Sequence, residues 1–334
     1  THSNAGHAAN MRVAMANSCN SYFCHLFRLI VDAKKYGNVR VGLQEWHDYM
    51  NKFGLGHALG VDVTGEYPGN IPDSSYFNKV YNNHWNSCNM TVMGMGQGEV
   101  LMTPIQLANA MCLIANRGYY HIPHFVKSIG GDVKHPMLNK YLERQNALTH
   151  VSNEAFDAII NGMVDVTTSG TGKVARLEGV NVASKTGTAE NFAKIYGKEV
   201  KLDNHSVFVC FAPAEDPKIA IAVIVQNSGY GATWAGPIAS LMMEKYLTDT
   251  VKRKPLEERM YNGNTIKKYI YTIDSLQREK DKVREYLRTA DKRSQDSLRK
   301  MQDTAIIRRM LKNYYNIRVS ENHPIINEKP IVQQ

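Results

Sequence analysis

Ser184-Lys-Thr-Gly-Thr-Ala-Glu190 is the stretch of this 334-residue chain that decides how the rest of the sequence is interpreted. It lies in a segment of strand character, 180–188, where a glycine lets a second backbone approach closely because it has no side chain. The ammonium group of Lys185 supplies positive charge, and the hydroxyls of Thr186 and Thr188 supply hydrogen-bond donors. Together these groups suit the binding of a carboxylate beside a carbonyl under attack.

A second triplet, Ser18-Cys-Asn20, precedes Lys185 in the chain. Ser-x-x-Lys, Ser-Asp-Asn and Lys-Thr-Gly, in that order, form the motif set of serine β-lactamases and penicillin-binding proteins. Two of these three motifs are present here in the right order, with cysteine at the middle position of the serine–asparagine triplet. The order makes a chance match of the short Lys-Thr-Gly triplet a poorer explanation than a shared active site.

Four further segments extend the match beyond the short triplets. They are Met95-Gly-Gln-Gly98, Thr103-Pro-Ile-Gln-Leu-Ala108, His205-Ser-Val-Phe-Val-Cys-Phe-Ala-Pro213 and Pro237-Ile-Ala-Ser-Leu-Met242. With them the chain resembles the class B penicillin-binding proteins over roughly residues 8–249, and most resembles penicillin-binding protein 2, the elongation-type transpeptidase.

The resemblance implies a role for each matching residue. Ser18 would relay a proton towards the leaving group, and Asn20 would hydrogen-bond the substrate amide. Lys185 would be the lysine of the Lys-Thr-Gly motif, and Thr186, Gly187 and Thr188 would bind the substrate and its terminal carboxylate. The backbone N–H of Thr188 would form half of the oxyanion hole. The nucleophilic serine and its lysine are absent from the chain and are expected upstream of residue 1.

The fold that this resemblance implies is an α+β penicillin-binding, serine β-lactamase-like fold, with an antiparallel sheet flanked by helices and incomplete at its N-terminus. The implied activity is that of a peptidoglycan D,D-transpeptidase, which joins D-Ala-D-Ala stem peptides through a serine acyl-enzyme. The implied ligands are stem peptides and β-lactams, with a membrane glycosyltransferase of the elongation machinery as partner and no nucleic acid. The expected location is the periplasmic face of the bacterial cytoplasmic membrane, reached through an N-terminal anchor. A non-catalytic scaffold and a class D-like β-lactamase or β-lactam sensor remain alternatives.

Three other motifs carry competing interpretations. Ser87-Cys-Asn89 repeats the serine–asparagine triplet, but it lies just before the Gly-Gln-Gly segment and is expected to be structural. Ser297-Leu-Arg-Lys300 is the only Ser-x-x-Lys in the chain, and it follows Lys-Thr-Gly in a charged tail, so we reject it as the nucleophile. Gly170-Thr-Gly172 lacks the lysine spacing of a phosphate-binding loop.

Metal binding is the weakest of the hypotheses that the sequence raises. His2, His7 and Cys19 include the usual zinc ligands, imidazole and thiolate, but a polar loop before a helix is the favoured interpretation. The chain has five cysteines, an odd number without paired spacing, so no disulfide framework is expected. The implied chemistry needs no cofactor.

The element pattern predicts a transpeptidase domain over residues 1–249 and an extension over 250–334. Helices are expected at 8–35, 43–53, 103–115, 152–168 and 237–247, strands at 119–129, 148–151 and 180–188, and a hairpin at 205–227, with a long loop at 54–86. Residues 1–250 carry equal numbers of acidic and basic residues, so the net charge of +9 falls in the last segment. We expect this basic extension to be helical or partly disordered.

Overall fold

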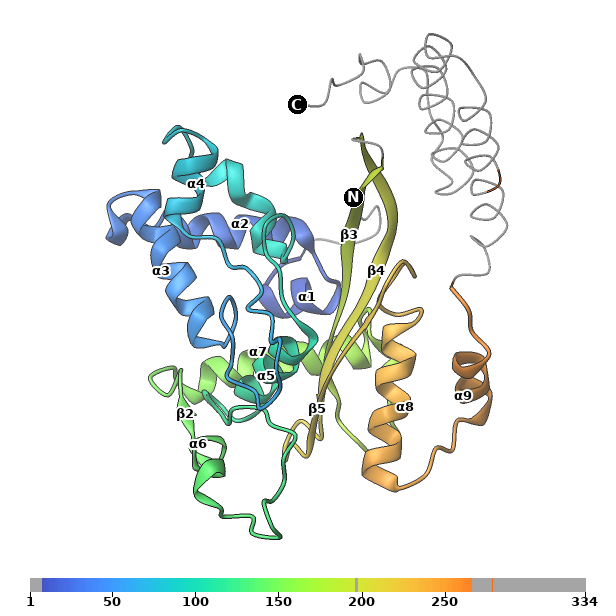
Figure 1. Ribbon diagram of the computed structural model, residues 1–334. Helices are drawn as coiled ribbons and strands as arrows, with labels where there is room; N and C mark the ends of the chain where they lie inside the picture. Colours follow the sequence, from blue (N-terminus) through green and yellow to red (C-terminus); the bar gives the residue numbers. More distant parts are fainter. Residues whose placement is uncertain (1–7, 196–197, 266–277, 279–334) are drawn as a thin grey trace, which may run out of the picture. The chain divides into compact units, whose positions relative to one another are not determined.

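The computed structural model describes residues 8–195, 198–265 and 278 of the chain (Figure 1). Its α-helices are α1 (Met11–Ala16), α2 (Asn20–Val31), α3 (Val39–Lys52), α4 (Ser74–Val80), α5 (Pro104–Ala115), α6 (Asn139–Leu142), α7 (Asn153–Thr168), α8 (Ala235–Thr248) and α9 (Lys254–Tyr261). The 3-10 helices are η1 (Lys34–Tyr36), η2 (Ser87–Met95), η3 (Pro136–Leu138) and η4 (Lys173–Ala175). The strands are β1 (Tyr119–Tyr120), β2 (Gln145–Asn146), β3 (Ala183–Ile195), β4 (Lys198–Ala212) and β5 (Ile219–Val225).

The main sheet has the strand order β3-β4-β5. Strands β4 and β5 are antiparallel, and their register runs from Ser206 opposite Val225 to Ala212 opposite Ile219. The predicted antiparallel sheet flanked by helices is therefore confirmed. In this order β3, which carries the Lys-Thr-Gly motif, lies at one edge of the sheet.

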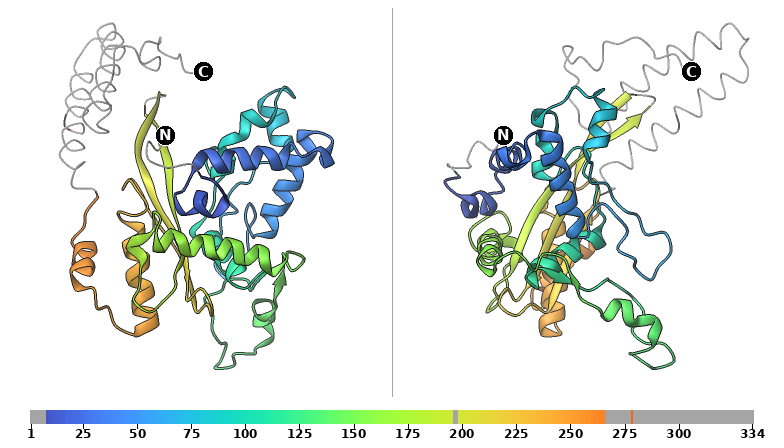
Figure 2. Two further views of the ribbon diagram at one scale, coloured as in Figure 1. Left: turned by 180° about the vertical axis from the view of Figure 1, so that it is seen from behind. Right: turned by 90° about the vertical axis from the view of Figure 1, so that its left-hand side faces the viewer.

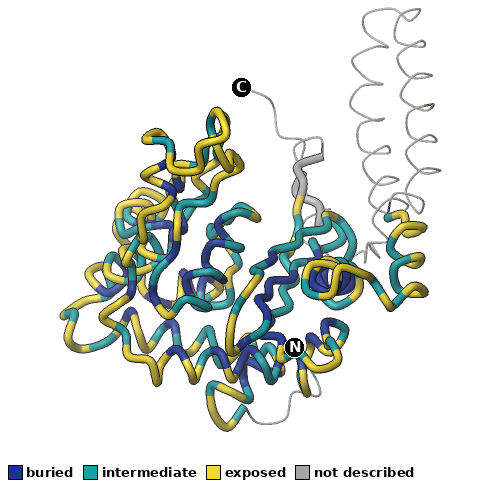
Figure 3. The backbone as a smooth tube through the Cα atoms, turned by 90° about the horizontal axis from the view of Figure 1, so that it is seen from below, coloured by how far each residue is buried: buried dark blue, intermediate teal, exposed yellow. Residues whose placement is uncertain are grey.

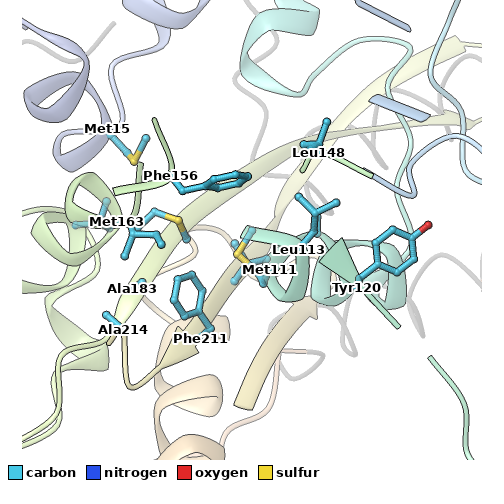
Figure 4. Close-up of a cluster of buried hydrophobic side chains, with 14 of the residues drawn as sticks. Met15, Met111, Leu113, Tyr120, Leu148, Phe156, Met163, Ala183, Phe211 and Ala214 are labelled. Atoms are coloured by element: carbon cyan, nitrogen blue, oxygen red, sulfur yellow. The ribbon is translucent and has the colours of Figure 1, made fainter. Parts of the chain in front are cut away.

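Alternate side chains of β4 enter two different cores, as the two-residue period of a strand requires. Val209 and Phe211 pack with α5 and α7 in one cluster, whereas Phe208, Cys210 and Ala212 pack with α8 in another. Figure 4 shows Phe211 in the first cluster beside residues of α5 and α7, and Figure 2 shows α7 lying across the strands from behind. The sheet is thus covered by helices on both faces, and its strands are largely buried or intermediate in Figure 3.

A third cluster holds the helices that follow α1. Its buried members come from α2, α3, α4, η2 and the connection between α4 and η2, namely Phe27, Val31, Leu43, Phe77, Trp85, Met90 and Met93. Gly94 allows η2 to approach α2 closely, because an added Cβ would lie 2.7 Å from the carbonyl oxygen of Phe23. This packing fixes η2, and the Gly-Gln-Gly turn after it, relative to the start of α2.

The predicted helices are found close to their expected positions. The break in the first helical region falls at residues 17–19, between α1 and α2. Thr103 begins α5 with a capping box to Gln106, and Ser152 caps α7 through the N–H of Ala155. Side-chain capping therefore locates these helix starts in the sequence.

Three expectations about the connecting segments are wrong. The loop predicted at 54–86 contains α4, which Asp73 caps and whose Phe77 is fully buried. The strand predicted at 119–129 ends after Tyr120, because the carboxylate of Asp62 accepts the backbone N–H groups of Phe125 and Val126 that a strand partner would otherwise use. These two bonds also lower the pKa of Asp62. The strand predicted at 148–151 is likewise absent, and β1 pairs instead with β2.

The described chain divides into two compact units. Of the described residues, the first unit comprises 8–188, 206–225 and 230–260, and the second comprises 189–195, 198–205, 226–229, 261–265 and 278. Within the second unit, Asn227 accepts a hydrogen bond from Asn191 and donates its backbone N–H to His205. No helix in the described ranges is long and apolar enough to cross a membrane. The boundary predicted at residue 249 stays a prediction, and most of the basic extension lies outside the described residues.

Candidate active site

Ser18 is held in a tight turn between α1 and α2. Its backbone φ of 53° lies in the left-handed region, which residues other than glycine adopt rarely. The turn is closed by the N–H of Ser18 on the carbonyl of Met15, at 3.1 Å, and by the N–H of Cys19 on Ala14, at 2.8 Å. A strained serine in an ordered turn is typical of functional sites, where the surrounding structure maintains the strain.

Helix α1 is fixed beneath this turn by α7. Arg12 forms an ion pair with Asp165, and its Nη2 donates to the second carboxylate oxygen at 2.9 Å. Gly162 brings the two helices together, because an added Cβ would lie 2.9 Å from the sulfur of Met15. The position of Ser18 is therefore set by residues of α7 that lie far from it in the sequence.

Lys185 joins the two predicted motifs. Its Nζ donates to Ser18 Oγ at 2.7 Å and to the carbonyl oxygen of Thr186 at 2.8 Å. An ammonium group has three hydrogens. Acceptors among the described residues take two of them, so one is left for a ligand. The structure thus brings together Ser18 and Lys185, as the motif order predicted.

Burial alters the acidity of Lys185. Loss of hydration disfavours the ammonium form and lowers its pKa from 10.5 to about 8. The side chain is still mainly charged at neutral pH, but it is closer to its titration point than an exposed lysine. A bound carboxylate would favour the charged form and offset the effect of burial.

Packing within the protein, as well as access for a substrate, requires a glycine at position 187. An added Cβ would lie 3.1 Å from Cβ of Val207 on β4. The loop before α8 also approaches here, since an added Cβ on Gly231 would lie 2.6 Å from the carbonyl oxygen of Gly187. The two glycines let this loop pack directly against the strand that carries the motif.

Gln97 contacts the C-terminal end of the Lys185–Thr188 segment. Its Nε2 donates to the carbonyl oxygen of Thr188 at 2.7 Å. The residue is presented by a turn whose flanking glycines, Gly96 and Gly98, have φ values of 74° and 71°. In a strand the N–H and C=O of one residue point to the same edge. By binding the C=O of Thr188, Gln97 therefore helps to fix the orientation of the Thr188 N–H. Gln97 lies in the Met95–Gly98 segment that matches the family, but no role could be predicted for it from the sequence.

We expect Gln97→Leu to slow acylation of the complete protein by a penicillin about tenfold, the size of one lost hydrogen bond. The variant keeps the volume of the side chain but removes its donor. Stopped-flow measurement of the second-order acylation rate constant tests this, with a melting curve to confirm folding. Gln97→Glu is the matched control, because a carboxylate has nearly the same shape and no hydrogen to donate. A rate for Gln97→Glu equal to that of the unsubstituted protein would show that only shape matters.

The other predicted positions differ in their surroundings. Asn20 is the first residue of α2 and is exposed, and Thr186 is partly buried beside Lys185. Ser87 is buried, donates to Asp32 and accepts from Arg28, while Asn89 belongs to a capping box. The polar groups of this second triplet are therefore used inside the helical region.

The zinc hypothesis involves residues that the structure covers only in part. Cys19 is a partly buried free thiol, whereas His2 and His7 lie outside the described residues. Among the described residues there is no group of three or more His, Cys, Asp or Glu side chains suited to a metal. Zinc binding stays a prediction.

Comparison with known proteins places this site in a family. The family model described as "Penicillin binding protein transpeptidase domain" matches residues 1–244. The chain is 32% identical over 232 residues to a peptidoglycan D,D-transpeptidase MrdA of Haemophilus influenzae, covering 66% of this chain and 35% of the relative. It is 31% identical over 268 residues to the protein of that name from Acinetobacter baumannii, covering 78% of this chain and 38% of the relative. The chain therefore spans little more than a third of the length of these relatives.

Solved structures agree with the sequence matches. The chain resembles penicillin-binding protein 2 of Pseudomonas aeruginosa, solved in complex with WCK 5153, with a TM-score of 0.58 and 27% identity over 73% of this chain and 49% of that one. It shares the fold of a Helicobacter pylori penicillin-binding protein 2, with a TM-score of 0.56 and 25% identity over 72% of this chain and 40% of that one. The matched family, the fold and the junction of Ser18 with Lys185 all lead to one assignment. This chain belongs to the penicillin-binding protein transpeptidase domain family.

Proposed function

We propose that the chain forms the substrate-binding part of a peptidoglycan D,D-transpeptidase of the elongation type. The observation that carries this proposal is the 2.7 Å contact between Lys185 Nζ and Ser18 Oγ, which unites the two motifs at the edge strand. The curated relatives named above as D,D-transpeptidases support the same activity. The substrate would be a D-Ala-D-Ala stem peptide, and a β-lactam would occupy the same site.

In the proposed reaction an activated serine attacks the carbonyl carbon between the two D-alanines. The C–N bond breaks, D-alanine leaves with a proton, and the remaining peptide is held as a serine ester. In this proposal Ser18 passes that proton to the leaving amine, and the charge of Lys185, which bonds Ser18 Oγ, stabilises the negative charge that develops on that oxygen. An amine of a second stem peptide then takes the acyl group and frees the serine.

Each remaining site residue contributes to binding. Lys185 and the hydroxyls of Thr186 and Thr188 face the terminal carboxylate, and Asn20 holds the amide of the acyl donor. The backbone N–H of Thr188 donates to the oxygen that becomes negatively charged, with Gln97 holding the peptide group on its other side.

The serine itself is proposed to come from outside these 334 residues. The only Ser-x-x-Lys of the sequence, Ser297–Lys300, follows Lys-Thr-Gly instead of preceding it and lies outside the described residues. We further propose peptidoglycan as the polymer acted on, a membrane glycosyltransferase of the elongation machinery as partner, and a periplasmic, membrane-anchored location. No cofactor is required by this chemistry.

The test compares the 334-residue chain with the product of the same gene extended upstream. We expect fluorescent penicillin to leave no label that survives denaturation on the chain alone, because acylation requires the serine nucleophile. The extended protein should be labelled at a serine of an upstream Ser-x-x-Lys, and replacing that serine with alanine should abolish the label. Label on Ser297 would contradict the proposed position of the nucleophile. No label on the extended protein would contradict the proposal and favour a non-catalytic scaffold.

A second measurement separates the transpeptidase from a class D-like β-lactamase or sensor. The labelled transpeptidase should release hydrolysed penicillin slowly, and it should transfer a D-Ala-D-Ala peptide to an added amine. Rapid, repeated hydrolysis of penicillin without transfer would assign the β-lactamase activity instead.

A further inference from the structure

The turn that ends α7 touches both halves of the active site. Its residues 169–172 follow the helix, with the N–H groups of Ser169 and Gly170 on the carbonyl of Asp165, each at 2.9 Å. The N–H of Thr171 then donates to the carbonyl of Ala16, at 3.1 Å, next to the turn that holds Ser18. The Gly170-Thr-Gly172 motif, which fits no phosphate site, therefore lies beside the catalytic turn.

Both glycines of this motif are required by close packing. An added Cβ on Gly170 would lie 2.1 Å from the carbonyl oxygen of Ala16. One on Gly172 would lie 2.8 Å from Oγ of Ser184, the residue before Lys185. The turn is thus pressed between the end of α1 and the start of β3, and Thr171 supplies the only side chain of the triplet.

That side chain reaches the Lys-Thr-Gly motif. Oγ1 of Thr171 lies 2.7 Å from Oγ1 of Thr186, and either hydroxyl can be the donor. Thr171 is exposed, so the hydroxyl pair lies at the surface of the site and not in the core. A purely structural turn would be served by any small residue between the two glycines.

The direction of this hydrogen bond decides what Thr186 can offer a ligand. A hydroxyl has one hydrogen and two acceptor lone pairs. If Thr186 donates to Thr171, it presents only lone pairs to an anion. If Thr171 donates to Thr186, the hydrogen of Thr186 is available for a carboxylate, and the two bonds strengthen each other.

We propose that Thr171 is a positioning residue for substrate carboxylates, because it donates to Thr186 and leaves the Thr186 hydroxyl to bind the anion. The inference rests on the proposed function and concerns the acyl-donor side of that site. It assigns to Thr171 selectivity for ligands with a free carboxylate, without direct contact between Thr171 and the reacting atoms.

The experiment measures acylation of the complete protein by a penicillin and by its methyl ester. Thr171→Val, which keeps the shape and removes the hydroxyl, should lower the second-order rate constant for the free acid about tenfold. The rate for the ester should change less than about twofold, and Thr171→Ser, which restores the hydroxyl, should recover most of the lost rate. Melting curves check that each variant is folded, and Thr171→Ala replaces the valine variant if that one is not.

A double variant tests whether Thr171 acts through Thr186. If it does, Thr171→Val combined with Thr186→Val should be no slower than Thr186→Val alone, which is the non-additivity expected of a coupled pair. Equal losses for acid and ester, or additive losses in the double variant, overturn this inference and leave the proposed function standing. Absence of acylation in the unsubstituted protein overturns both.

Discussion

Replacing Lys185 with alanine is expected to lower the second-order rate of acylation by a penicillin about 10²–10³-fold in the protein that includes the serine. Loss of one preorganised electrostatic group in an active site commonly has an effect of that size. Lys185 bonds Ser18 Oγ in the structure, and in the proposed function it also binds the incoming carboxylate, so its removal should affect both the proton relay and binding. Stopped-flow fluorescence with a penicillin reports the rate directly.

Two controls make this result specific. The melting temperature should change little, because among the described residues the Lys185 ammonium group bonds only Ser18 and a carbonyl of its own strand, and its burial already disfavours the charged form. A methyl ester of the same penicillin should lose less rate than the free acid, because it offers no carboxylate to the missing ammonium group. An unchanged rate in a folded Lys185→Ala protein would mean that the match to the Lys-Thr-Gly motif is accidental.

The parts of the fold that were predicted from the sequence are those set by local chemistry. Thr103 and Ser152 cap their helices with side-chain bonds a few residues away, so the helix starts are visible in the sequence. The strand alternation of 206–212 follows from one buried face against α5 and another against α8. Local signals of this kind do not depend on knowing which distant segments meet.

The errors have two different causes, a distant residue that binds the backbone and a local signal that was overlooked. Asp62 binds the N–H groups of Phe125 and Val126 and so ends the strand that the apolar pattern predicted. Helix α4 was hidden because Gly, Pro and Asn residues surround it, although Asp73 is a recognisable N-cap and Phe77 a buried anchor. In the first case a tertiary contact overrides the local pattern, and in the second the local capping signal was overlooked.

In the site, too, some residues could be identified from the sequence and others only from their contacts in space. Ser18, Asn20 and Lys185 were proposed as site residues because their motif order is distinctive, and the structure joins Ser18 to Lys185. Gln97 and Thr171 were not, since their roles depend on which carbonyl or hydroxyl lies opposite them in space. The only sequence signal at each position is a pair of flanking glycines, which indicates close packing but not its partner.

The second large effect expected at this site is its pH dependence. Burial lowers the pKa of Lys185 to about 8, so the ammonium group is charged below that pH and loses its proton above it. The second-order acylation rate constant reports ionisations of the free protein. For a penicillin with a free carboxylate, we expect this constant to fall about tenfold for each pH unit above about pH 8, as the loss of one proton requires.

Lys185→Arg separates this titration from any other group in the site. A guanidinium stays charged over the whole range, so the variant should keep an intermediate rate at pH 7, with its altered donor geometry, and should lose the decline centred near pH 8. In the unsubstituted protein the ester should decline less than the free acid, because it has no carboxylate to bind the ammonium group and depends on Lys185 only through Ser18. A decline with the same midpoint in Lys185→Arg would assign the titrating group to another residue and would remove the buried ammonium from the account of carboxylate binding.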